Sequence, residues 1–103
     1  MKVLIILLLL CSSAQAYTLD QWADSIRITE GNPNYGVISP KFHDKRQVCK
    51  NTVKHLLMAY RGNSGDLKAT VAWVADHYCP YSVDPIGNRN WKHNMIVLLR
   101  RSK

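Results

Sequence analysis

Apolar residues recur every three or four positions in four separate stretches of this chain. This spacing is typical of helices that bury one face and expose the other. The predicted helices cover residues 18–30, 45–60, 66–78 and 88–100. Glycine, proline and asparagine are frequent in the segments between them, and these residues favour turns. No repeat or linker is visible, so the sequence predicts one small all-α domain of about four helices.

The first sixteen residues have the layout of a secretory signal peptide. A positive start is followed by an apolar run at 3–10 and by small residues at 14 and 16. We expect cleavage after Ala16, which leaves residues 17–103 as a single helical domain of a secreted or periplasmic protein. The apolar run is too short to anchor the chain in a bilayer. A lipoprotein signal at Cys11 is the alternative, although leucines rather than small residues precede that cysteine.

Two cysteines, Cys49 and Cys79, remain in residues 17–103. In a chain that enters an oxidising compartment they predict one disulfide, which would also stabilise so small a domain. Cys49 lies in the first turns of one predicted helix and Cys79 follows the next, and such ends meet in an antiparallel hairpin. Two free thiols are the alternative. Neither the cysteines nor the four histidines have metal-ligand spacing, so we expect no metal and no cofactor.

The fourteen basic and seven acidic residues of the chain include Lys2, so residues 17–103 keep a net charge of +6. The bases gather at 41–54, 89–92 and 100–103. Such a surface attracts anionic partners, among them cell-wall polymers, lipid headgroups and extracellular nucleic acid. A basic surface that only keeps the protein in solution is an equal alternative. We expect a monomer that binds peptidoglycan or another anionic cell-envelope polymer, with no nucleic-acid partner and no stable membrane insertion.

A glutamate extends the apolar stripe of the first predicted helix. That stripe consists of Leu19, Trp22, Ala23 and Ile26. Glu30 follows Ile26 by four residues on the same face, and the next residue is a glycine that ends the helix. Apolar surroundings favour a protonated carboxyl, which is the form that a general acid needs near neutral pH. The alternative is a structural glutamate that pairs with Arg27 or Arg89 or bonds to the backbone of the turn.

The end of the catalytic helix in the lysozyme-like superfamily resembles residues 28–39 of this chain, ITEGNPNYGVIS. The resemblance implies a minimal lysozyme-like fold in which Glu30 is the catalytic acid. It also implies that Gly31, Tyr35 and Gly36 form the turn beside the glycan cleft. The implied activity is cleavage of peptidoglycan, by a lytic transglycosylase or a muramidase. The Gly-Leu-Met-Gln segment of many soluble lytic transglycosylases is absent.

Most of residues 17–103 is also similar to small secreted proteins of proteobacteria and their phages, which have no established activity. The shared segments are Glu30-Gly31, Tyr35-Gly36, Tyr78-Cys79-Pro80 and Asp84 to Trp91. One interpretation of the last segment is a rim that binds sugar hydroxyls, N-acetyl groups and sugar faces. Together with Tyr35, that rim would consist of Asn88, Arg89, Asn90 and Trp91. The other interpretation assigns the asparagines to helix capping and Trp91 to the core.

The chemistry of glycan cleavage depends on whether a second carboxylate assists Glu30. Most glycoside hydrolases use two, and Asp44 and Asp84 are the loop carboxylates available here. A lytic transglycosylase uses one glutamate as acid and then as base, with the muramyl 6-hydroxyl as the nucleophile. The lack of a clear partner favours this second reaction. A non-catalytic cationic binding module for peptidoglycan is the main alternative to an enzyme, and a membrane-active protein that uses residues 95–103 is another.

Overall fold

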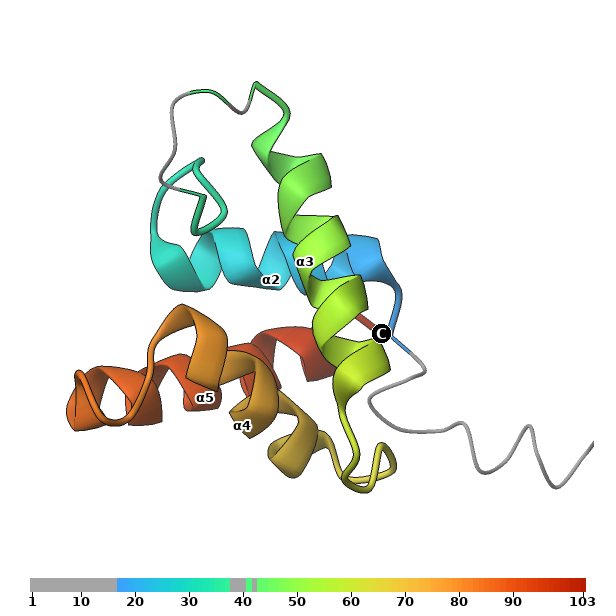
Figure 1. Cartoon of the computed structure of the whole chain (residues 1–103), viewed down its shortest axis with the longest axis vertical. Helices are drawn as coiled ribbons and strands as arrows, with labels where there is room; N and C mark the ends of the chain where they lie inside the picture. Colours follow the sequence, from blue (N-terminus) through green and yellow to red (C-terminus); the bar gives the residue numbers. More distant parts are fainter. Residues whose placement is uncertain (1–16, 38–40, 42) are drawn as a thin grey trace, which may run out of the picture.

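The computed structural model describes residues 17–37, 41 and 43–103 (Figure 1). They contain the four helices α2 (Leu19–Glu30), α3 (Lys45–Ala59), α4 (Leu67–Tyr78) and α5 (Pro85–Arg101). No strand occurs among these residues, so the predicted all-α fold is confirmed. The predicted signal peptide, with Cys11, lies outside the described residues.

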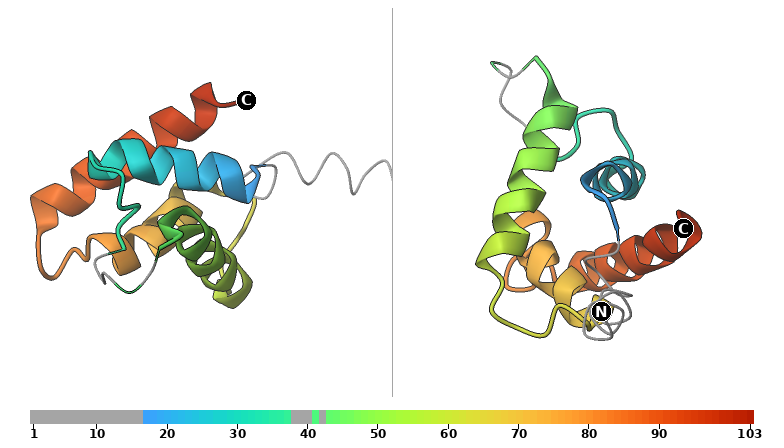
Figure 2. Two further views of the ribbon diagram at one scale, coloured as in Figure 1. Left: turned by 90° about the horizontal axis from the view of Figure 1, so that it is seen from above. Right: turned by 90° about the vertical axis from the view of Figure 1, so that its right-hand side faces the viewer.

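Helix α2 lies between α3 and α5 and packs against both (Figure 1 and Figure 2). Helix α4 packs against α5 and α3 and so closes the bundle. The beginning of α2 and the end of α5 meet, because Gln21 Nε2 donates to the Ser102 carbonyl at 3.0 Å. Nearby, the Lys103 ammonium lies 5.0 Å from the centroid of the Tyr17 ring. The opposite end of α2, which carries Glu30, therefore lies far from both ends of the described chain.

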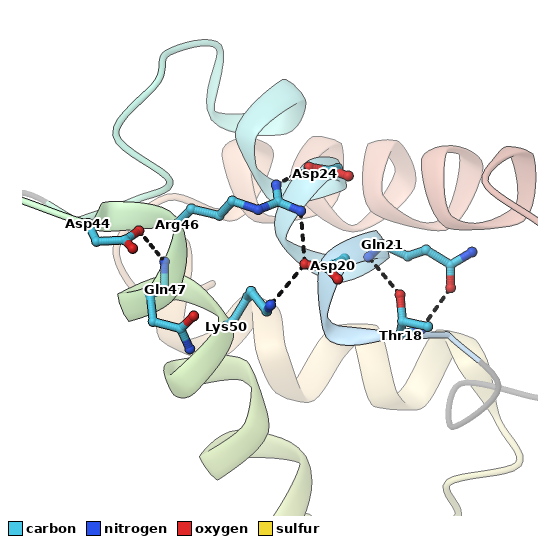
Figure 3. Close-up of polar contacts among 8 residues, drawn as sticks. All are labelled: Thr18, Asp20, Gln21, Asp24, Asp44, Arg46, Gln47 and Lys50. Atoms are coloured by element: carbon cyan, nitrogen blue, oxygen red, sulfur yellow. Dashed lines mark hydrogen bonds and ion pairs between the residues drawn. The ribbon is translucent and has the colours of Figure 1, made fainter.

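Each of the four helices begins at a polar N-cap whose side chain accepts a backbone N–H of the first turn. The caps are Thr18, Asp44, Asp66 and Asp84, which accept from Gln21, Gln47, Ala69 and Gly87. These bonds satisfy N–H groups that have no partner within the helix. Thr18 and Gln21 form the predicted capping box, in which the Gln21 side chain accepts the Thr18 N–H at 2.7 Å (Figure 3).

Helix α5 begins three residues earlier than the sequence predicts. Its N-cap is Asp84 and its first residue is Pro85, whereas the prediction started the helix at residue 88 with Asn88 or Asn90 as the cap. Proline suits the first helical position, because the N–H that it lacks would have no intrahelical partner there. The prediction was wrong because an Asp-Pro pair that favours a turn is also a good helix start.

The inward faces of all four helices form the core. Its largest fully buried side chains are Trp22, Ile26, Cys49, Val53, Thr70, Val71, Val74, Met95 and Leu99. In α2, Trp22, Ala23 and Ile26 have no exposed surface, so the stripe that precedes Glu30 is buried as predicted. The helix thus carries an apolar face along most of its length and a carboxyl at the end of that face.

Ion pairs join α2 to α3 on the outer side of the bundle (Figure 3). Arg46 Nη2 and Lys50 Nζ both lie 2.9 Å from Asp20 Oδ1, and Arg46 also pairs with Asp24. These contacts lower the pKa of Asp20, chiefly through the hydrogen bond from Lys50 and then that from Arg46. Part of the basic cluster at 41–54 is therefore neutralised within the protein, and it contributes less to anion binding than the sequence suggests.

The predicted disulfide is not formed, because Cys49 and Cys79 are free thiols. Cys49 is fully buried, and its Sγ lies 3.6 Å from the Tyr78 hydroxyl. Cys79 is the C-cap of α4 and is only partly buried. The prediction placed the two cysteines at neighbouring helix ends, but that was not enough to predict a bond. The Cys49 sulfur contacts the hydroxyl of Tyr78 instead.

Alkylation of the folded protein is expected to label Cys79 and to spare Cys49. Cys49 has no exposed surface, so a reagent cannot reach its sulfur, whereas Cys79 is only partly buried. In denaturant without a reductant, both cysteines are expected to react. Peptide mapping by mass spectrometry measures each site separately. Two cysteines that react only after reduction would contradict the free thiols.

Candidate active site

A pocket of about 320 Å³ opens at the C-terminal end of α2. Its lining consists of Glu30, Asn32, Asn34, Gly36, Val37 and Tyr78. Glu30 is the single glutamate of the whole sequence, and it is the only lining residue with a side chain that ionises near neutral pH. The apolar stripe of α2 thus leads to one carboxyl at the edge of a small cavity.

The turn after α2 folds back over Glu30 because three of its residues have a positive φ. Gly31 (φ 75°) ends the helix, and its N–H points to the carbonyls of Arg27 and Ile28 at 3.1 Å. Tyr35 (φ 53°) and Gly36 (φ 74°) then reverse the chain. Left-handed backbone of this kind is typical of glycine and is rare for tyrosine. The reversal brings the backbone of residue 36 against the end of α2.

Gly36 is the point of closest approach between the turn and the site. A Cβ atom at this position would lie 2.8 Å from two ring carbons of Tyr78 and 3.1 Å from Glu30 Oε1. No other residue type has room for its side chain there without displacing the ring or the carboxyl. The close contact therefore depends on glycine, and it packs the turn against Glu30 and Tyr78 together.

Hydrogen bonds among the asparagines hold the turn in this shape. Asn32 Nδ2 donates to the Glu30 carbonyl at 3.3 Å, and Asn32 Oδ1 accepts the N–H of Asn34 at 2.9 Å. The Asn34 side chain then accepts from Lys45 Nζ at 2.9 Å, which ties the turn to the first residue of α3. Both asparagines also line the pocket, so the turn that they hold in shape forms part of its wall beside Glu30.

Burial raises the pKa of the Glu30 carboxyl, because a partly desolvated carboxylate loses hydration. The smaller and opposite effect comes from the side chain of Trp91, which lies close enough to the carboxyl to lower its pKa. No ion pair joins Glu30 to Arg27 or Arg89, the two partners that a structural role would provide. The carboxyl therefore has the raised proton affinity that suits a general acid.

Two stacked aromatic rings form the inner side of the site. The rings of Tyr78 and Trp91 lie 5.5 Å apart with an interplanar angle of 12°. Trp91 is 5% exposed, and burial together with Cys49 raises the pKa of the Tyr78 hydroxyl. Helices α4 and α5 thus each supply one aromatic ring next to the end of α2.

The residues of the predicted sugar-binding rim do not line this pocket. Asn88 is 3% exposed and donates from Nδ2 to the Cys79 carbonyl at 2.7 Å, so it joins α5 to the end of α4. Trp91 belongs to the core, whereas Arg89 and Asn90 are exposed on the outer face of α5. The four residues therefore do not form one exposed surface, since Asn88 and Trp91 lie on the buried face of α5 that also carries Met95 and Leu99.

Tyr35 and the two loop carboxylates also lie elsewhere than a substrate cleft would require. Tyr35 packs against the core, and with Asp24 it raises the pKa of Arg46. Asp44 and Asp84 both serve as N-caps, with their carboxylates bonded to backbone N–H groups at 3.0 and 2.9 Å. Neither aspartate lines the pocket, so Glu30 has no second carboxylate beside it there.

The sequence analysis missed Tyr78, which it named only as part of the shared segment Tyr78-Cys79-Pro80. Tyr78 lines the pocket, its ring stacks on Trp91, and its hydroxyl contacts the sulfur of Cys49. Its position as the last residue of α4, beside a cysteine and a proline, was the available signal, but only the folded chain brings it to Gly36.

In the part of the chain that the structure describes, no group of His, Cys, Asp and Glu could hold a metal ion. No helix within that part is long and apolar enough to cross a bilayer.

Comparison with known proteins gives no match to this chain among family models, curated proteins or solved structures.

Proposed function

We propose that this protein cleaves the glycan strands of peptidoglycan, with Glu30 as a general acid and then a general base. The observation that carries the proposal is the partly buried Glu30 carboxyl in a pocket of about 320 Å³, with burial raising its pKa. A structural glutamate would be expected to pair with a neighbouring base, and Arg27 and Arg89 are left unused for this purpose. The proposed site thus has a proton donor that faces a cavity.

A single glutamate favours a lytic transglycosylase over a hydrolase. Protonated Glu30 donates its proton to the glycosidic oxygen as the bond from that oxygen to C1 breaks. The resulting carboxylate then accepts the proton of the muramyl 6-hydroxyl while O6 forms a bond to C1. The products are a new hydroxyl end and a 1,6-anhydromuramyl end, and Glu30 regains its proton without consumption of water.

The positive charge of the protein supports an anionic wall polymer as the substrate. Residues 17–103 carry a net charge of +6, and Arg89, Arg100 and Arg101 are exposed on α5. Such charges raise the local concentration of an anionic polymer around the molecule. They act at a distance, since none of the three arginines lines the pocket beside Glu30.

Digestion of purified peptidoglycan, with product analysis by mass spectrometry, tests the proposal. The wild-type protein is expected to release fragments with anhydromuramyl ends, and Glu30→Gln is expected to release them far more slowly. Reducing ends would instead indicate hydrolysis and a second carboxylate. If neither protein releases fragments but both sediment with the wall, the enzyme proposal fails and a binding module takes its place.

The Asp84→Asn variant is expected to keep both wild-type cleavage and wild-type stability. Asparagine caps a helix as well as aspartate does, so α5 keeps its first turn while the charge is removed. The control is Asp84→Ala, which removes the cap and is expected to lower the free energy of unfolding by about 1 kcal/mol. Urea unfolding and the digestion assay measure the two effects. Loss of cleavage in a stable Asp84→Asn protein would make Asp84 the second carboxylate.

A further inference from the structure

The indole N–H of Trp91 is buried without a hydrogen-bond acceptor. Trp91 is 5% exposed, and no acceptor satisfies hydrogen-bond geometry at its Nε1. A buried donor that stays unpaired destabilises a protein by about 1–3 kcal/mol. Such a group in a native structure needs a structural or functional explanation.

A candidate acceptor is the carboxyl of Glu30, because the Trp91 side chain lies close enough to lower the pKa of this carboxyl although its N–H falls short of hydrogen-bond geometry. A protonated carboxyl is a weak acceptor, whereas a carboxylate is a strong one that forms shorter bonds. The direction of the indole ring is fixed, since Tyr78 stacks on it at 5.5 Å and Gly36 packs against Tyr78. The donor is thus held in place before the acceptor gains its charge.

We propose that Trp91 is a positioning residue that donates its indole N–H to Glu30 after the carboxyl has lost its proton. The bond would compensate the charge that the partly buried carboxylate acquires and would fix its orientation. The role of this contact in catalysis rests on the proposed function, because it would hold the carboxylate for the second, base-catalysed step. The contact itself does not depend on cleavage of any substrate.

The other titratable groups that face Glu30 stay neutral while it loses its proton. They are Cys49 from α3 and Tyr78 and Cys79 from α4, and burial is the main cause that raises the pKa of each, with a smaller contribution from Glu30. All three pKa values therefore lie further from the ordinary range of a carboxyl. The ionisation of Glu30 is therefore expected to follow a single step.

The pKa of Glu30 can be measured without overlap from other glutamates, because Glu30 is the single glutamate of the sequence. Protein labelled with glutamate that carries ¹³C at Cδ gives one carboxyl resonance, whose position against pH reports the pKa of Glu30. The Trp91→Phe variant keeps an aromatic ring for Tyr78 to stack on and removes the N–H donor together with part of the buried ring, a loss of packing that the control below shares. Its Glu30 pKa is expected to lie above that of the wild-type protein.

The matched control is Trp22→Phe. Trp22 is also fully buried with an unpaired indole N–H, but it lies two turns before Glu30 in α2. This variant loses the same kind of donor from the core and is expected to leave the Glu30 pKa at its wild-type value. A general effect of weakened packing would move the pKa in both variants, and that result would overturn the proposal.

A second measurement needs no tryptophan variant and so remains decisive if Trp91→Phe fails to fold. In the ¹⁵N-labelled wild-type protein, the indole N–H resonance of Trp91 is expected to shift with the same midpoint as the Glu30 carboxyl. In Glu30→Gln this shift is expected to vanish. An indole resonance that ignores the ionisation of Glu30 would overturn the proposal. If the contact is found but no glycan is cleaved, the proposed function fails while the contact stands.

Discussion

The Glu30→Gln variant is expected to cleave peptidoglycan about 10²–10⁴-fold more slowly than the wild-type protein, the usual contribution of general acid–base catalysis. Glutamine keeps the size and shape of the side chain but carries no acidic proton, so protonation of the glycosidic oxygen is lost. The rate of release of soluble fragments measures the effect. The control is Asp76→Asn, which changes an exposed carboxylate of α4 that does not line the pocket. Equal rates for Glu30→Gln and the wild-type protein would remove Glu30 from the reaction.

The same variant is expected to be more stable than the wild-type protein at neutral pH. Burial raises the pKa of Glu30 in the folded state, so between the unfolded and folded pKa values the folded protein binds the extra proton. The stability linked to this proton is fully present below the unfolded pKa and is lost as the pH rises through the folded pKa. Glutamine has no charge to bury, and Glu30→Gln therefore gains stability relative to the wild type as the pH increases.

Urea unfolding at two pH values measures this difference. About pH 4 lies just below the ordinary pKa of a glutamate carboxyl, and about pH 7 lies well above it. The two proteins are expected to be closest in stability at the lower pH and to separate at the higher one. Gain of stability with loss of activity is common where a functional group is held in an unfavourable environment. If Glu30→Gln were instead less stable than the wild type at about pH 7, the carboxylate would be a structural group with a favourable partner.

The parts of the structure that the sequence predicts well are those that depend on near neighbours in the chain. The capping box of Thr18 and Gln21, the end of α2 at Gly31 and the apolar face that leads to Glu30 all follow from residues within one or two helical turns. The turn at 31–36 was also expected, since glycine and asparagine favour it. These local signals were sufficient for the fold class.

The parts that the sequence does not predict depend on how distant segments meet. Only the packing of α4 against α5 stacks Tyr78 on Trp91, and only the reversal of the turn brings Gly36 to both Tyr78 and Glu30. The four rim residues of α5 are divided between the core and the outer face, because Asn88 and Trp91 share the face that packs against the other helices. The prediction of a disulfide was wrong for a related reason. Two helix ends can be neighbours while the side chain of one cysteine, here Cys49, is buried in the core.

The Gly36→Ala variant is expected to lower the free energy of unfolding by about 2–4 kcal/mol and to abolish cleavage. Two effects add. Alanine is strained at a φ of 74°, and its Cβ would lie 2.8 Å from the Tyr78 ring. That ring cannot move freely, because it is stacked on Trp91. The turn must therefore move away from Glu30, which changes the pocket that holds the carboxyl.

The two effects can be separated within the same turn, because Gly31 has almost the same φ as Gly36 (75° against 74°) and a Cβ there would meet no atom within 4 Å. Gly31→Ala therefore carries the backbone strain alone and is expected to lose about 1 kcal/mol. Urea unfolding of both variants gives the contribution of close packing as their difference. Equal losses would show that Gly36 is needed only for its backbone conformation. A larger loss at Gly36, together with loss of cleavage in that variant alone, would show that the contact with Tyr78 and Glu30 shapes the site.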